Sequence, residues 1–139
     1  MASSVKLNRR ALATVVSTAA DESAYKGAQA ARGRTMSNII RLGRIDTGKM
    51  IQGMQVRRAP ELAAKFGPNG SAYTVSSSAT YTIYQEKGTR PYASPPGKVM
   101  VFKPKGSSTF VFATKRRGVK AGHFLRDAVR ASRLADFTR

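Results

Sequence analysis

The chain has 139 residues, with 25 Lys and Arg against 7 Asp and Glu, which gives a formal net charge of +18. This surplus predicts a polyanion or an acidic protein surface as the partner, and the length fits a single domain over residues 1–139. Because the chain contains no cysteine, disulfides, thiolate metal sites and a cysteine nucleophile are excluded.

The first predicted element is a long helix over residues 9–42. This stretch is rich in Ala and lacks Pro, and its small and apolar residues recur at close to helical spacing. Gly27 and Gly33 each cost about 1 kcal/mol relative to Ala inside a helix, so the helix is expected to bend or break there. Gly43 is suited to the position just past its end.

A mixed segment over residues 46–114 follows, and it begins with Asp46-Thr47-Gly48. Asp46 or Thr47 is expected to cap a short helix, because the side-chain oxygen of either residue can accept a bond from a free helix N–H. A strand is predicted after that helix, over residues 54–58.

A second strand is predicted between residues 72 and 84. Tyr, Thr, Val, Ser and Ile dominate this stretch, and apolar and polar side chains alternate at its start. Propensity does not decide whether residues 80–87 continue the strand or form a helix.

The best hairpin signal lies at residues 98–114. Apolar residues fill both faces of residues 98–103 and of residues 109–114, and residues 104–108 between them suit a turn. Because both faces are apolar, the hairpin is expected to be covered on both sides or to lie in an interface.

The last predicted element is an amphipathic helix over residues 122–135. Phe124, Leu125 and Ala128 recur there at helical spacing, and arginines occupy the other side. The expected fold class is therefore α+β, with a long N-terminal helix, a small antiparallel sheet with a prominent β-hairpin, and a C-terminal amphipathic helix.

Catalytic arrangements are few. Asp46-Thr47-Gly48 resembles the aspartic-protease signature, in which two aspartates share a proton, so this chain would supply the pair only as a dimer. Arg44 and Lys49 flank the triplet and favour an ionised carboxylate, which makes helix capping the preferred interpretation. His123 is the only histidine and Glu86 lies beside cations, so packing and local ion pairing are expected of them. We expect no enzyme, no cofactor and no metal site, and a dimeric aspartic hydrolase remains as the catalytic alternative.

The positive charge is the feature with chemical content. Seven cations flank the predicted hairpin and are expected to converge on one rim, where they would bind DNA or an acidic partner. They are Lys98, Lys103, Lys105, Lys115, Arg116, Arg117 and Lys120. Bases could also stack on tyrosine rings, although core packing is the expected role for most of these rings. The tyrosines concerned are Tyr73, Tyr81, Tyr84 and Tyr92.

Three motifs occur in order along the chain, at residues 46–50, 81–89 and 122–128. With the hairpin between the second and third, they resemble the head–tail joining and tail-completion family of long-tailed bacteriophages, over about residues 41–129. The family pattern is a D-T-G-x-L-like turn after a long helix, a Y-A-x-Y-x-E-x-G-T-like segment and a P-F-L-x-x-A-like terminal helix. The matching structural positions are Asp46, Thr47, Gly48, Tyr81, Tyr84, Glu86, Gly88, Thr89, Phe124, Leu125 and Ala128.

The resemblance implies a helix over residues 80–87 and a structural virion subunit of the neck or tail top, made in the host bacterial cytoplasm. Such subunits form homo-oligomeric rings, sixfold or twelvefold in this family. The rings join head to tail between head-completion or adaptor rings and tail-tube or tail-terminator rings. Genomic DNA passes through the channel without sequence-specific contact, and no membrane is involved. A basic RNA- or DNA-binding protein of ribosomal or nucleoid type is the alternative that the charge leaves open.

Overall fold

A computed structural model of the chain describes residues 8–44 and 48–138. The chain folds as two compact units. The helical unit comprises Met1–Thr80 with Phe124–Arg139, and the hairpin unit comprises Tyr81–His123. Residues within each unit pack mainly with one another, and the single domain expected from the length stays a prediction.

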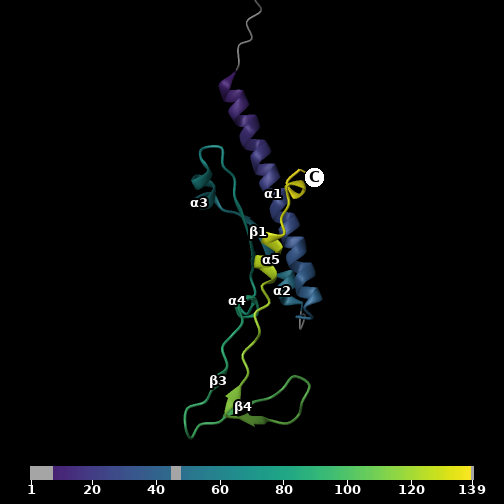
Figure 1. The fold of residues 1–139 in the computed structure, drawn as a ribbon, viewed down its shortest axis with the longest axis vertical. Helices are drawn as coiled ribbons and strands as arrows, with labels where there is room; N and C mark the ends of the chain where they lie inside the picture. The colour runs from purple at the N-terminus through teal and green to yellow at the C-terminus, as the bar shows by residue number, and fades with distance from the viewer. Residues whose placement is uncertain (1–7, 45–47, 139) are drawn as a thin grey trace, which may run out of the picture. The chain divides into compact units, whose positions relative to one another are not determined.

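The helical unit is built on α1, Arg9–Arg41 (Figure 1). Asn8 caps this helix, because its side-chain oxygen accepts hydrogen bonds from the backbone N–H groups of Arg10 and Ala11, each at 3.2 Å. The long helix predicted from the Ala-rich spacing is confirmed. It ends at Arg41, one residue before the predicted end at residue 42.

The helix α1 does not break at its two glycines. Gly27 is buried, and the ring of Phe137 occupies the space that a Cβ at position 27 would need. Gly33 is exposed and has open space around it. Packing of the Phe137 ring against the helix therefore explains why position 27 has a glycine, whereas no such contact explains the glycine at position 33.

Short elements follow α1. They are α2 (Lys49–Gln52), β1 (Met54–Arg58), α3 (Pro60–Ala63), the 3-10 turn η1 (Ala64–Phe66) and β2 (Tyr73–Ser77). The predicted helix and two strands occur among them in the predicted order, while α3 and η1 were not predicted. Strands β1 and β2 pair antiparallel, with Met54 opposite Ser77 and Arg58 opposite Tyr73. The two predicted strands of this region are thus present as one two-stranded sheet.

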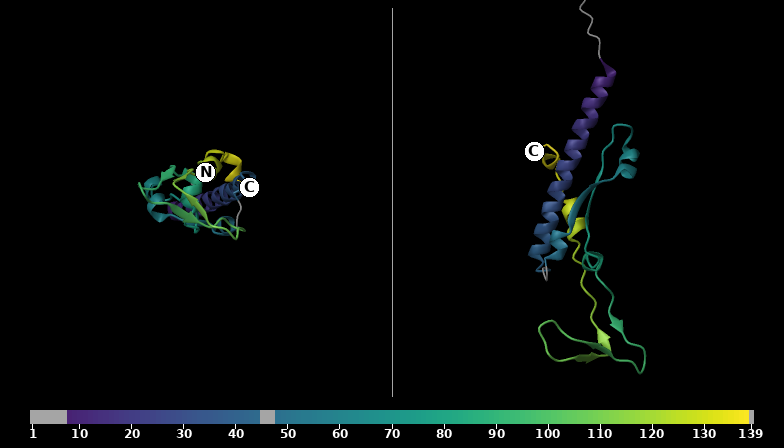
Figure 2. Two further views of the ribbon diagram at one scale, coloured as in Figure 1. Left: turned by 90° about the horizontal axis from the view of Figure 1, so that it is seen from below. Right: turned by 180° about the vertical axis from the view of Figure 1, so that it is seen from behind.

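The core of the helical unit is small. Its buried cluster joins α1, α2, β1 and α5 (Phe124–Arg130), and α5 lies against α1 in both ribbon views (Figures 1 and 2). The cluster consists of Ile39, Met50, Met54 and Phe124. Four such side chains bury little apolar area, so each one carries a large share of the stability.

The C-terminal helix is shorter than predicted. It was expected over residues 122–135, but α5 ends at Arg130, and a separate 3-10 turn, η2, follows at Leu134–Asp136. The Asp136 carboxylate accepts a bond from the backbone N–H of Arg133 at 2.6 Å and pairs with Arg34 of α1 at 2.5 Å. These bonds hold the chain end as a distinct turn against α1, which accounts for the interruption.

Two carboxylates of the helical unit fasten other segments to α1. Asp21 accepts hydrogen bonds from the hydroxyls of Ser71, at 2.5 Å, and Tyr73, at 3.0 Å, and both bonds lower the pKa of Asp21. The bond from Arg34 lowers the pKa of Asp136 in the same way. Each carboxylate is therefore more acidic in the folded chain than in the unfolded chain.

The hairpin unit contains one helix and two pairs of short strands. Its elements are α4 (Thr82–Lys87), β3 (Tyr92–Ala93), β4 (Met100–Phe102), β5 (Val111–Ala113) and β6 (Lys115–Arg116). The predicted hairpin corresponds to the antiparallel pair β4–β5, and β3 pairs antiparallel with β6. Residues 82–87 are helical, as the resemblance implies. Among the described residues, no helix combines the length and apolar character that a bilayer crossing requires.

Candidate functional site

The hairpin unit exposes its apolar side chains. Of the described residues in this unit, only Thr82 is buried. Val101 of β4 and Phe112 of β5 lie opposite each other, and 55% and 68% of their surfaces are exposed. The neighbouring exposed residues are Val99, Phe102, Phe110 and Val111. The described part of the unit therefore does not cover its own hairpin, so the expected cover on both sides is absent from the described residues, and the interface stays a prediction.

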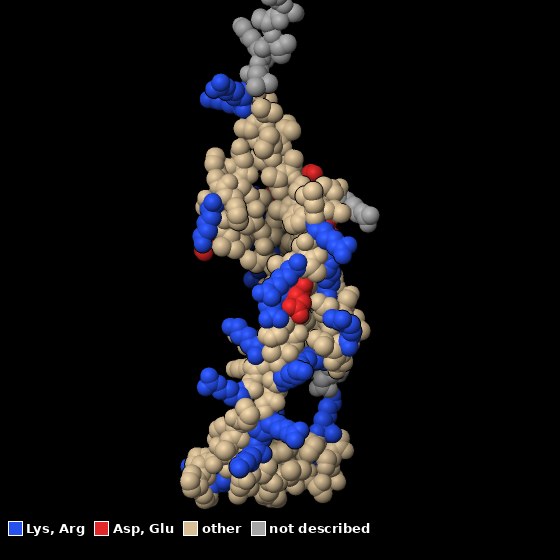
Figure 3. All heavy atoms as spheres, in the orientation of Figure 1, with Lys and Arg blue, Asp and Glu red and all other residues tan. Residues whose placement is uncertain are grey.

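The same unit is strongly positive. Residues 81–123 contain nine Lys and Arg and one acidic residue, Glu86. All seven predicted cations lie in this unit, and all are exposed. Figure 3 shows basic side chains over much of the visible face and few acidic ones. The unit thus combines an apolar hairpin with a strongly positive surface.

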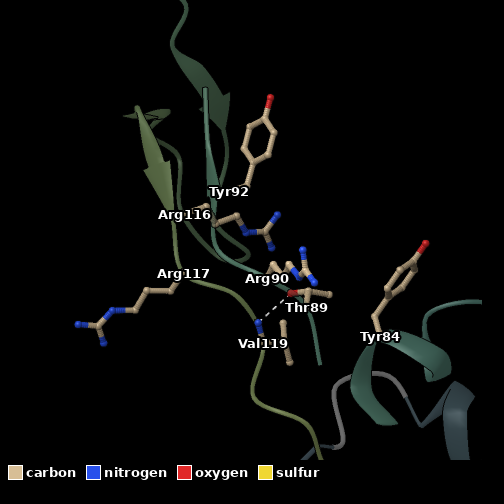
Figure 4. Close-up of a pocket in the computed structure, with 7 residues that line it drawn as sticks. All are labelled: Tyr84, Thr89, Arg90, Tyr92, Arg116, Arg117 and Val119. Atoms are coloured by element: carbon tan, nitrogen blue, oxygen red, sulfur yellow. Dashed lines mark hydrogen bonds between the residues drawn. The ribbon is translucent and has the colours of Figure 1, made fainter. Parts of the chain in front are cut away.

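The seven cations do not all share one side of the unit. Successive strand residues point to opposite faces, so Lys115 and Arg116 diverge. Figure 4 shows Arg116 and Arg117 pointing in opposite directions. Lys103 instead lies over the ring of Phe110, with its Nζ atom 5.9 Å from the ring centre. The charge is therefore distributed over several surfaces.

One of these surfaces is a hollow of about 380 Å³. We call it the Arg–Tyr hollow, and its lining consists of Tyr84, Thr89, Arg90, Tyr92, Arg116, Arg117 and Val119. In Figure 4 the guanidinium groups of Arg90 and Arg116 lie on the same side of the strands as the rings of Tyr84 and Tyr92, while Arg117 points away. No acidic residue lines the hollow.

Strand pairing positions three of these side chains. Tyr92 of β3 lies directly opposite Arg116 of β6, so their side chains share one face of the pair. Arg90 precedes Tyr92 by two residues, which is the spacing of residues on one face of an extended chain. Within the described part of the chain, the guanidinium groups of Arg90 and Arg116 have no hydrogen bond or ion pair.

The backbone beneath the hollow is closely fastened. The N–H of Thr89 donates to the Val119 carbonyl at 2.9 Å, and the N–H of Val119 donates to the Thr89 hydroxyl at 2.8 Å. Gly118 lies so close to the backbone of residues 89–91 that a Cβ would clash with it. Glycine, which has no side chain, is therefore required at position 118. The two backbone segments joined here hold the side chains that line the hollow.

The motif positions of the resemblance fall in different places. Asp46 and Thr47 lie outside the described residues, so the cap predicted from them is not described, and Gly48 precedes α2 with φ +72°. Tyr81 lies just before α4, Tyr84 and Glu86 lie on it, and Gly88 and Thr89 follow it. Phe124 and Ala128 are buried in the helical unit, with Leu125 packed against its core.

The described candidate acid and base groups have local partners. His123 has φ +50°, and its N–H donates to the carbonyl of Glu86 at 3.1 Å. Asp127 pairs with its neighbour Arg126 at 3.1 Å. Over residues 8–44 and 48–138, no three His, Asp or Glu side chains gather closely enough to hold a metal ion.

Sequence reasoning missed part of the hollow. Arg90 was not among the seven predicted cations. Core packing was expected of most of the four tyrosines, but Tyr81, Tyr84 and Tyr92 are exposed, at 39%, 58% and 55% of their surfaces. Tyr73 is half-buried and makes an edge contact with Tyr25. The alternation of Arg90 and Tyr92 was a visible signal, but their pairing with residue 116 was not.

Comparison of this chain with protein-family models, with curated proteins and with solved structures gave no match in any of the three.

Proposed function

We propose that this chain is a structural subunit of a ring at the head–tail junction of a long-tailed bacteriophage. The motif order supplies the family, and the exposed apolar hairpin is the observation that carries the proposal. Apolar side chains on both strands of β4–β5 are left in water by the described chain. An assembled subunit gains free energy by burying such a surface against its neighbours.

The geometry of a ring suits this surface. In a ring each subunit presents one patch to the next subunit through a repeated head-to-tail contact, and rotation closes the assembly. The hairpin would supply one side of that contact. The cations around it would face DNA in the channel or the acidic surfaces of adjoining rings, with affinity that falls as salt increases.

The test is the mass and shape of the purified chain at physiological salt. We expect a mass that is an integral multiple of 15.0 kDa by light scattering, and closed annular particles by electron microscopy. Phe112→Glu places a charge in the interface and is expected to leave monomers with an unchanged far-UV circular dichroism spectrum. Leu134→Glu is the matched control, because Leu134 is 82% exposed and lies in the helical unit.

Rings that persist in the Phe112→Glu protein would remove the hairpin from the assembly contact. If the wild-type chain is monomeric, it is expected to assemble only when produced with the products of its neighbouring genes, which should encode portal, capsid and tail-tube proteins. A monomer from another genetic setting that binds duplex DNA or structured RNA tightly would favour the ribosomal or nucleoid alternative instead.

A further inference from the structure

We infer that the Arg–Tyr hollow binds a nucleotide unit of single-stranded nucleic acid. This inference does not use the exposed apolar residues of the proposed ring contact, and it stands or falls independently of the phage assignment. Its starting point is the chemistry of the lining, which combines guanidinium groups with exposed phenol rings on one side of a strand pair.

The hollow differs from two others in the described chain. A hollow of about 540 Å³ between α1 and α5 includes Asp127, and a hollow of about 310 Å³ beside the C-terminal turn includes Asp136. A carboxylate in the lining repels an anion, whereas the Arg–Tyr hollow presents only cations among its charged groups. It is therefore the one of the three that suits an anionic ligand.

The arginines specify the anion. Arg90 and Arg116 have no ionic partner in the described chain, and guanidinium groups bind phosphate oxygens through paired N–H donors. Phosphate alone would not need two exposed tyrosines. The exposed fraction of the residue surface is 58% for Tyr84 and 55% for Tyr92. A flat partner beside the phosphate would bury both rings, and a nucleobase supplies such a face.

The ligand must be unpaired. The bases of a duplex are stacked on one another, so their faces are closed to side chains, whereas single strands offer each base to an aromatic ring. The volume of the hollow, about 380 Å³, is within the range of small-molecule sites and suits one nucleotide. The fastened backbone of residues 88–91 and 117–119 keeps the side chains in place before binding, which reduces the entropy lost on association.

The experiment measures binding of the full chain to a fluorescently labelled twelve-residue oligothymidylate by anisotropy, across a salt series. An oligomer of the same length with abasic sites retains the phosphates and lacks the bases. We expect wild-type protein to prefer the oligothymidylate by about 5- to 150-fold. Tyr84→Ala and Tyr92→Ala should remove most of that preference while leaving binding to the abasic oligomer unchanged.

Matched variants separate the hollow from general charge. Arg116→Gln should weaken binding and reduce the salt slope by about one phosphate contact, while Lys98→Gln, an exposed cation outside the lining, should have a much smaller effect. Tyr81→Ala is the control for loss of an aromatic ring, since Tyr81 does not line the hollow. Tyr92→Trp should keep the preference and, because the chain has no tryptophan, its fluorescence should be quenched by the oligomer.

Several results would overturn the inference. Equal affinity for the oligothymidylate and the abasic oligomer would show that only charge is bound. Duplex of equal length that binds as tightly, with the same dependence on Tyr92, would show that unpaired bases are not the ligand. Displacement by an acidic peptide with dependence on both tyrosines and both arginines would assign the hollow to a protein partner. Parallel measurements with oligouridylate distinguish RNA from DNA as the source of the nucleotide. The mass of the Tyr92→Ala protein in light scattering should equal that of the wild-type protein. This measurement separates a loss of oligonucleotide binding from a loss of ring assembly.

Discussion

The helical unit and the hairpin unit use apolar residues in opposite ways. In the helical unit, Phe124 is 1% exposed and joins helices and strands from distant parts of the sequence. In the hairpin unit, Phe112 is 68% exposed and contributes to no buried cluster of the described chain. The contrast indicates that one unit is stabilised by its own core, while the other leaves its apolar side chains exposed. Under the proposed function a neighbouring subunit would cover them.

The strongest test of this contrast compares two phenylalanines. Phe124→Ala should lower the free energy of unfolding by about 3–5 kcal/mol, because it leaves a cavity in a small core. Phe112→Ala should change it by less than about 0.5 kcal/mol in the monomer. Urea unfolding followed by circular dichroism measures both, and equal losses would mean that the hairpin has a core of its own.

A glycine of the hairpin unit provides the second test. Gly118→Ala would force apart the backbone at residues 89–91, so the preference for oligothymidylate over the abasic oligomer should fall by about 5- to 150-fold. Unfolding of the helical unit should be unchanged. Val99→Ala is the control, since Val99 is 52% exposed and does not line the hollow, and loss of binding in that variant as well would point to general disruption of the unit.

Two glycines of α1 sharpen the account of the helical unit. Gly33→Ala should stabilise the chain by about 1 kcal/mol, as expected for an exposed helix interior. Gly27→Ala should stabilise it less or destabilise it, because the new methyl group must displace the Phe137 ring. The difference should vanish in a Phe137→Ala background. If it persists there, contact with Phe137 does not explain Gly27.

Acid should have the smallest effect, and it should act through the helical unit. The pKa values of Asp21 and Asp136 are lowered on folding, so their contribution is present above the unfolded pKa of about 3.9 and is lost as pH falls through the folded values. Stability measured by urea unfolding should therefore decrease as pH falls below about 4. Asp136→Asn should flatten that decrease, and an unchanged profile would show that the Arg34 pair does not stabilise the fold.

Local patterns predicted the elements, and distant contacts decided the rest. Ala-rich spacing was enough for α1, and alternation was enough for β2 and the β4–β5 hairpin. The helix α4 followed from the resemblance, because β-branched and aromatic residues there left propensity undecided. The early end of α5 depends on Arg34 and Asp136, which are 102 residues apart, and no local signal carries such a contact.

The candidate site shows the same limit. The seven cations were found by counting, but their directions depend on the strand pleat and on the pairing of β3 with β6. Tyr92 and Arg116 become neighbours only through that pairing, because the whole hairpin lies between them in the sequence. The Arg–Tyr hollow was therefore beyond reach of any argument from spacing along the sequence.

The two ends of the hairpin unit lie close together. The N–H groups of Gly122 and His123 donate to the carbonyls of Gln85 and Glu86, at 2.9 and 3.1 Å, so the chain departs and returns at nearly one point. When the two ends of an inserted segment lie close together, a change in the length of that segment adds little to the entropic cost of closing the loop. Residues 90–117 can therefore lengthen or shorten in evolution while the buried cluster of the helical unit stays the same.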